Sequence, residues 1–199
     1  MKEINIKSDT IEKGLDLAKE FLQSILKPSL DEVGELFADR VKLWRVKNQV
    51  KNIEKVKAIV EKEGIKTKAI NMKVLFPYLD AVALEDDETL QDMWANLFAN
   101  YIDQEMNLTL TVYPEILRQL SSEEATVLQV LFTNSRYSPI PLSSTCETSN
   151  LERLGLIKQE TSTYTNLGTV SIESTGKYQL TEFGDDFVDA CTRNKKSSM

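Results

Sequence analysis

The sequence contains no histidine, and this absence removes a large class of catalytic and metal sites. A Ser-His-Asp catalytic triad or a Cys-His dyad needs an imidazole, and so does any metal site with a histidine ligand. The sequence also lacks a phosphate-binding glycine loop, a nucleophile elbow and the paired cysteines of metal sites. We therefore predict that the protein is not an enzyme and holds neither a metal nor a cofactor.

Cysteine is scarce as well, with only Cys146 and Cys191 in 199 residues. A chain of this size needs no disulfide to fold, so we predict two free thiols in a reducing cytosol. No run approaches the roughly 18 apolar residues of a transmembrane helix, and the first residues lack the apolar segment of a signal peptide. These absences favour a cytoplasmic protein without a transmembrane segment.

The net charge of -7 disfavours a surface that is basic throughout, but the charges are unevenly distributed. Residues 40–62 carry eight basic side chains against two acidic ones. Residues 80–92 carry six acidic side chains and no basic one. A local basic patch therefore remains available, although phosphate groups would meet little positive charge elsewhere.

The first region, residues 1–110, reads as a set of helices with one long helix over 29–62. Apolar residues at helical spacing predict further helices, which cover residues 9–26, 72–84 and 89–103. Gly64 is expected to end the long helix, and Asn71 is expected to cap the helix that follows. Trp94 and Trp44 both lie at core spacing, so we predict that both pack inside.

The second region, residues 111–193, changes character from helices to a mixture of helices and strands. We predict helices over 114–120 and 125–132, a loop at 134–144 that Pro139 and Pro141 keep irregular, and a helix that runs into a strand near residue 156. A β-hairpin within 158–180 and a last helix follow, and the tail 194–199 is expected to be disordered. The predicted class is mainly α, with a winged-helix-like α+β module whose wing is the hairpin.

The apolar residues of the long helix lie on one side before Trp44 and on the opposite side after it. One apolar stripe consists of Val33, Phe37, Val41 and Trp44, and a second stripe on the opposite side consists of Val46, Val50, Ile53 and Val60. Three explanations are open: the helix bends, it projects to a different neighbour, or it packs against a second copy to form a homodimer.

A basic face accompanies the second stripe and includes Arg40, Lys47, Lys51, Lys55 and Lys62. It is either a solvated surface, a docking face for the chain's own acidic segment 85–92, or a surface for nucleic acid or anionic lipid. Within that acidic segment, Asp86 and Asp87 precede a helix, where negative side chains complement the helix dipole better than they surround an ion.

Asn96 and Asn100 lie four residues apart on the helix of Trp94 and therefore share a face. They either hydrogen-bond a partner chain or ligand, or form an internal network with nearby backbone, arginine or lysine groups. Cys146 has no histidine and no neighbouring lysine to activate it, so we expect an ordinary thiol.

Three stretches carry a family resemblance: KPSLDEVGELFADRVKLWRVKNQVKNIEKV, LEDDETLQDMWANLFANYID and YPEILRQLSSEEATVL. They resemble the abortive-infection alpha (Abi-alpha) family of bacterial proteins. The resemblance continues through LERLGLIK and YQLTEFGDDFVDAC and covers roughly residues 27–190. It implies a role in bacterial defence against phage, and it supplies no catalytic residue.

We therefore predict a non-enzymatic antiphage protein that acts through a protein partner, from host or phage. The candidate interaction residues are Arg40, Trp44, Val46, Lys47, Val50, Lys51, Ile53, Lys55, Asp86, Asp87, Asn96 and Asn100. The alternative is a DNA-binding regulator. It is disfavoured because residues 111–199 carry eight basic and eleven acidic residues, and the predicted wing, Gln159–Gly176, has no lysine or arginine.

Overall fold

The computed structural model describes residues 13, 14, 16–18, 20–22, 24, 43–134, 138–166 and 169–193. The chain divides into two compact units, one formed by residues 1–118 together with 190–199 and the other by residues 119–189. The predicted division of the chain near residue 111 stays a prediction. The first part of the predicted long helix and the tail 194–199 lie outside the described residues.

The first unit contains four helices with bounds in the described residues: α3 (Leu43–Glu63), α4 (Met72–Val82), α5 (Glu88–Ile102) and α6 (Tyr113–Leu117). The predicted signals define their ends. Gly64 follows α3 with a φ of 63°, a conformation that favours glycine. The Asn71 side chain accepts a hydrogen bond from the Lys73 amide, and Asp87 accepts one from the Leu90 amide, so that both residues cap a helix N-terminus.

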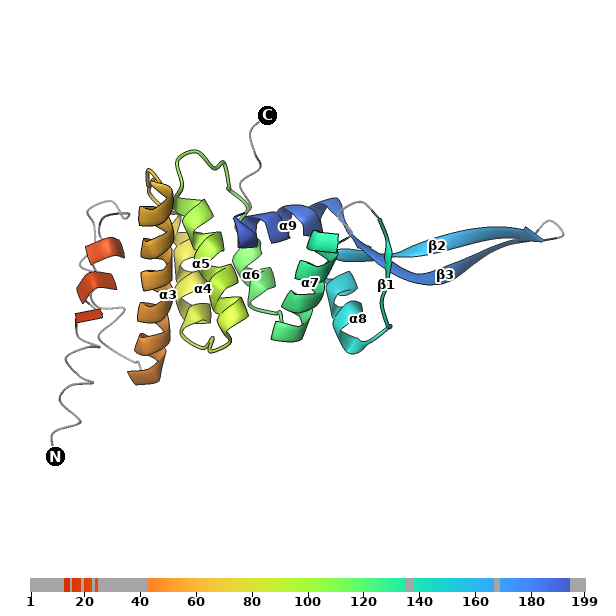
Figure 1. The fold of residues 1–199 in the computed structure, drawn as a ribbon, viewed down its shortest axis with the longest axis horizontal. Helices are drawn as coiled ribbons and strands as arrows, with labels where there is room; N and C mark the ends of the chain where they lie inside the picture. The colour runs from red at the N-terminus through yellow and green to blue at the C-terminus, as the bar shows by residue number, and fades with distance from the viewer. Residues whose placement is uncertain are drawn as a thin grey trace. The chain divides into compact units, whose positions relative to one another are not determined.

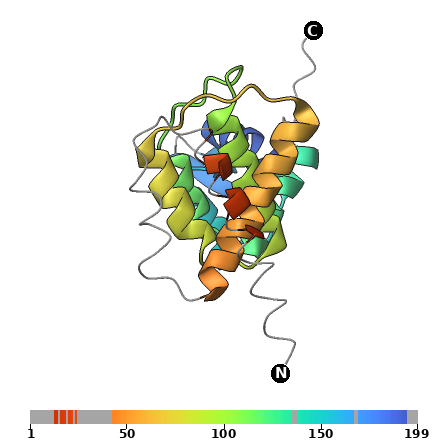
Figure 2. The same ribbon diagram turned by 90° about the vertical axis from the view of Figure 1, so that its left-hand side faces the viewer.

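Helix α3 packs against α5 and α4, and α4 also contacts α6 (Figure 1). The core of this unit includes Trp94, which is 1% exposed, as the helical spacing predicts. The Tyr78 ring meets Trp94 edge-on with centroids 6.1 Å apart and stacks on Phe98 at 4.1 Å. The described N-terminal helical residues, 13 to 24, lie against α3, and Figure 2 shows them in front of the helical layer.

The second unit alternates helices and strands: α7 (Ser122–Asn134), β1 (Ile140–Pro141), α8 (Cys146–Arg153), β2 (Ile157–Asn166), β3 (Thr169–Leu180) and the start of α9 (Glu182–Thr192). The strands form an antiparallel sheet in the order β1-β3-β2. Leu128, Leu131, Leu151, Leu156 and Phe187 are completely buried within this unit. From Ala190 onward, α9 belongs to the first unit.

The prediction of a mainly α chain with an α+β C-terminal part is confirmed, and the hairpin lies where the sequence predicts it. Assignment to the winged-helix class stays a prediction. The predicted loop over 134–144 is wrong in one detail, because Ile140 and Pro141 pair with Tyr178 and Lys177 as strand β1. An edge strand tolerates proline, since the missing N–H can face away from its neighbour. Among the described residues, none of the helices combines the length and the apolar character of a transmembrane span.

Candidate functional site

Two of the predicted basic-face residues contact the chain's own acidic segment. Lys51 Nζ lies 2.5 Å from Glu88 Oε2, and Lys55 Nζ lies 3.3 Å from Glu88 Oε1. Lys55 also pairs with Asp92. Of the three interpretations of the basic face, docking on the acidic segment therefore holds for Lys51 and Lys55, whereas Lys47 is exposed.

These contacts shift the pKa values of two of the groups. Hydrogen bonds from Lys51 and Lys55 hold the pKa of Glu88 below its ordinary value of 4.5. Burial opposes the charged form of Lys55, but hydrogen bonds to Asp92 and Glu88 outweigh it, and the pKa of Lys55 lies above its ordinary value of 10.5. Glu88 and Lys55 are therefore both charged at neutral pH, and less positive charge is left for a phosphate.

The apolar stripe that suggested a dimer seam is covered within the chain. Val46 and Val50 are each 8% exposed, and Ile53 is 2% exposed. Gly14 approaches so closely that a Cβ at its position would lie 2.8 Å from Val50 Cγ1. A homodimer through this stripe therefore requires the N-terminal helical residues to move away, and the stripe is not a free seam.

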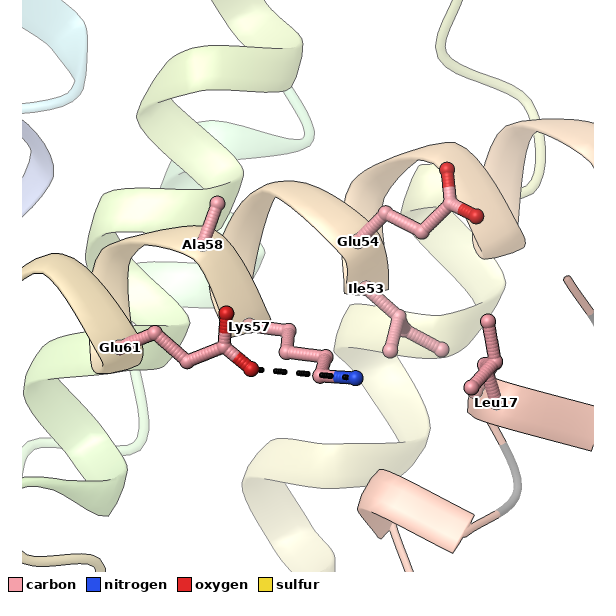
Figure 3. Close-up of a pocket in the computed structure, with 7 residues that line it drawn as sticks. Leu17, Ile53, Glu54, Lys57, Ala58 and Glu61 are labelled. Atoms are coloured by element: carbon pink, nitrogen blue, oxygen red, sulfur yellow. Dashed lines mark ion pairs between the residues drawn. The ribbon is translucent and has the colours of Figure 1, made fainter.

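A cavity of about 190 Å³ lies between the N-terminal helical residues and α3 (Figure 3). Its lining consists of Leu17, Ala18, Ile53, Glu54, Lys57, Ala58 and Glu61. Lys57 pairs with Glu61 at 3.8 Å, while the Glu54 carboxylate points away from that pair. The cavity is smaller than typical ligand sites of about 300 Å³ or more, and its polar groups do not converge on one point.

A buried polar network joins α3, α4 and α5, and the sequence did not predict it. Asn52 Nδ2 donates to Gln91 Oε1 at 2.5 Å and to the Gln91 carbonyl at 2.8 Å. The Tyr78 hydroxyl donates to Asn52 Oδ1 at 2.7 Å, and burial raises the pKa of Tyr78 far above its ordinary value. Because a tyrosine that stays protonated is a permanent donor, this network has a structural role rather than an acid–base one.

Asn100 belongs to a second buried network, at the other end of α5. Its Nδ2 donates to the Ala190 carbonyl at 2.6 Å, and its Oδ1 accepts from Arg193 Nη1 at 2.6 Å. Arg193 Nη2 also lies 2.9 Å from Glu63 Oε2 and 2.9 Å from Asp103 Oδ2. Of the two roles predicted for Asn100, the internal network with backbone and arginine is therefore the one the structure shows.

Arg193, Glu63 and Asp103 were not among the predicted site residues. Arg193 is 130 residues from Glu63 in the chain, and no local pattern links the two. The only feature of the sequence that pointed to this network was Arg193 itself, an arginine just after the last helix. Asn96, the other asparagine of the predicted pair, is half-buried on α5.

The acidic segment before α5 caps the N-terminus of that helix. Asp87 Oδ1 accepts from the Leu90 amide at 2.9 Å, and Glu85 Oε1 accepts from the Asp87 amide at 3.0 Å. Burial raises the pKa of Glu85, backbone hydrogen bonds from Asp87 and Asp86 partly oppose this shift, and the two neighbouring carboxylates add to it. Asp86 is exposed. Over the described ranges, no group of three or more cysteine, aspartate or glutamate side chains is arranged to hold a metal ion.

In helix α8 of the second unit, the polar side chains best suited to contact DNA bases form hydrogen bonds within the unit. Arg153 donates to Asn150 Oδ1, with Nη2 at 2.7 Å, and to Gln119 Oε1 at 3.1 Å. Asn150 in turn donates to Glu124 Oε1 at 2.6 Å. Because arginine and asparagine are the side chains that read base edges, their engagement leaves α8 poorly equipped for DNA.

The hairpin of β2 and β3 carries an exposed and uncharged surface. Directly paired residues share a face, and Thr163 is paired with Ile172. We call this side the Ile172 face, and its described members are Thr161, Thr163, Thr165, Ile172 and Ser174. Ile172 is 70% exposed, and no charged residue occurs between positions 161 and 172.

The two cysteines are free thiols in different surroundings. Cys146 is exposed at the start of α8, and Cys191 is buried in α9. Burial raises the pKa of Cys191 far above its ordinary value, so this thiol stays protonated.

Two predicted interaction residues cannot be placed in this network of contacts. Arg40 lies outside the described residues. Trp44 belongs to α3 by its backbone, while its side chain lies outside the described part of the structure.

Comparison with known proteins adds one positive finding. A family model described as abortive infection alpha matches residues 40–146, which is more than half of the chain and includes α3 and everything up to the first residue of α8. No curated protein and no solved structure matches the chain significantly.

Proposed function

Because the chain belongs to the abortive infection alpha family, as its sequence predicted, we propose that it is a bacterial antiphage protein that acts by binding another protein. It works in the cytoplasm and catalyses no reaction. Family membership supports the setting of abortive infection. The missing histidine and the divergent polar groups of the cavity in Figure 3 support a role without catalysis.

The single observation that carries protein binding is the Ile172 face. Hydroxyl and aliphatic side chains on a two-stranded ribbon supply no positive charge to attract phosphate, and they are suited to packing against another polypeptide. An exposed isoleucine surrounded by threonines can be buried at little desolvation cost, because no charge has to leave water. The partner is a host or phage protein; a second copy of this chain is the remaining candidate.

The test is a phage challenge of bacteria that produce the protein. We expect Ile172→Glu to abolish protection, because a carboxylate in the contact would be desolvated without a partner. Ser171→Glu is the matched control, since Ser171 pairs with Tyr164 on the opposite face of the same hairpin. Equal protection by both variants would rule out the Ile172 face as the contact surface.

The second candidate function is a DNA-binding regulator, which the order of helices and hairpin in the second unit favours. The charges of this unit oppose it, because residues 119–189 carry four basic and ten acidic side chains. Binding of duplex DNA at two salt concentrations separates the candidates. Tight binding that weakens steeply with added salt would support the regulator and refute the proposed protein-binding role.

A further inference from the structure

The network around Arg193 has the composition of an arginine-binding site. The guanidinium is held by the Glu63 carboxylate, the Asp103 carboxylate and the Asn100 amide oxygen, at distances of 2.6 to 3.2 Å. All four residues belong to the first unit. The Arg193 side chain is 8% exposed and that of Asp103 is 9% exposed, so water takes little part in these bonds.

Two of the three acceptors are oriented by bonds that do not involve Arg193. Asp103 Oδ1 accepts from the Glu105 amide at 2.9 Å, which leaves Oδ2 for the guanidinium. Asn100 Nδ2 donates to the Ala190 carbonyl, and this bond turns Oδ1 toward Arg193. An acceptor set that is oriented in advance loses little entropy when it binds a planar, five-donor guanidinium.

The backbone of Arg193, which fills this site, is strained, whereas the acceptors are oriented by their own hydrogen bonds. Arg193 has a φ of 46°, in the left-handed region that is strained for a residue other than glycine. It follows the last residue of α9 and brings one positive charge to two carboxylates. A guanidinium that approaches without this backbone strain would satisfy the same acceptors.

We propose that Glu63, Asp103 and Asn100 form an arginine-recognition site that the chain fills with its own Arg193, and that an arginine side chain of a protein partner can take the place of Arg193. The site is a property of the first unit and is separate from the Ile172 face in the second unit. It exists whether or not the protein acts in phage defence.

Chemical rescue of the full-length Arg193→Ala protein tests the site. We expect millimolar ethylguanidinium to raise the melting temperature of this variant in a saturable way and to raise that of the wild type much less, because Arg193 competes for the same acceptors. Ethylammonium at the same ionic strength is expected to bind about tenfold more weakly, because it lacks the planar fork. A variant with Asp103→Asn in addition should lose the rescue. No saturable rise, or an equal rise in the wild type, would overturn the site.

If Arg193→Ala is too unstable to melt cooperatively, Arg193→Lys takes its place, and ethylguanidinium should still raise its melting temperature because lysine cannot reproduce the fork. The exchange is tested on the wild type by the NMR signal of Arg193 Nε. Acetylarginine amide should move that signal toward the position of a solvent-exposed arginine. An unchanged signal at saturating acetylarginine amide would reduce Arg193 to a permanent structural ion pair and refute the exchange.

Discussion

The two units of the protein bury polar side chains for different purposes. In the first unit, the buried residues Asn52, Gln91 and Asn100 bond to other elements of the fold. In the second unit, the buried residues Glu124 and Thr148 complete capping boxes at the starts of their own helices, Glu124 with Ser121 and Thr148 with Thr145. The first unit thus uses these polar groups between elements, whereas in the second unit both cap a helix, and Glu124 also accepts a bond from Asn150 of α8.

The difference shows how each unit specifies one arrangement. Amphipathic helices packed through apolar surfaces alone could slide or rotate, and a satisfied polar pair between them selects one register. The second unit has its strands paired residue by residue, and its last helix is placed by backbone contact. There, the Thr181 hydroxyl donates to the Gly155 carbonyl at 2.6 Å, and the Thr181 amide donates to the Leu156 carbonyl at 3.0 Å.

The largest expected effect comes from Gly184→Ala in the second unit. A Cβ at Gly184 would lie 1.9 Å from the Leu156 carbonyl oxygen, and a backbone atom has little freedom to move aside. We expect a loss of about 3 kcal/mol in the free energy of unfolding of this unit. Hydrogen exchange followed by mass spectrometry can measure it for β2 and α7 separately from the first unit.

Gly176→Ala is the matched control within the same unit. Gly176 has a φ of 70°, but a Cβ there would meet nothing within 4 Å. The cost should be about 1 kcal/mol, from the left-handed backbone alone. If Gly184→Ala lowers the free energy of unfolding no more than Gly176→Ala does, the close backbone contact at Gly184 does not position α9.

The next largest effect should follow from Asn52→Ala in the first unit. The substitution leaves the Tyr78 hydroxyl and the Gln91 amide oxygen buried without this partner, which costs about 2 to 3 kcal/mol. Trp94 lies in the same core, so its fluorescence during urea unfolding reports the change.

Gln49→Ala provides the comparison for Asn52. Gln49 makes one bond, to the Leu79 carbonyl at 3.0 Å, and its own Oε1 has no hydrogen-bond partner among the described residues. Its removal should therefore cost less than that of Asn52. Equal losses would mean that side-chain volume, rather than the polar network, specifies the packing of α3.

The smallest effects are expected at Glu85 and Glu88, where the signs are opposite. The pKa of Glu88 is lowered in the folded state by hydrogen bonds from Lys51 and Lys55, so Glu88 stabilises the fold above its unfolded pKa of 4.5 and loses that contribution as the pH falls through its folded pKa. The pKa of Glu85 is raised by burial, so stability falls as the pH rises above the unfolded pKa of 4.5, and the loss is complete above the raised folded pKa.

Melting temperatures of Glu88→Gln and Glu85→Gln should therefore move in opposite directions at pH 7 and return toward the wild type below pH 4.5. Added salt should shrink the Glu88 effect, because that ion pair is exposed. A loss of stability for both variants at pH 7 would contradict the assignment for Glu85.

Much of the local structure was predictable because its signals lie within a few residues. Asn71 caps α4 as the sequence predicted, and Asp87 before α5 and Ser121 with Glu124 before α7 form caps over equally short distances. The candidate site was predictable only in part. Asn100 was a candidate because it shares a helix face with Asn96. Its partner Arg193 lies 93 residues away, and no local pattern connects the two.

The sequence by itself determined where most of the described helices and the hairpin lie, although not strand β1, because caps, glycines and apolar spacing act over one or two turns. It also determined that the hairpin between 161 and 172 bears no charge. Only the tertiary structure decided that Lys51 and Lys55 meet Glu88, that Gly14 lies against Val50 of the second stripe, and that Arg193 lies between Glu63 and Asp103. Such contacts join residues from 33 to 130 positions apart, and they form because packing brings helix faces together, which no short-range preference encodes.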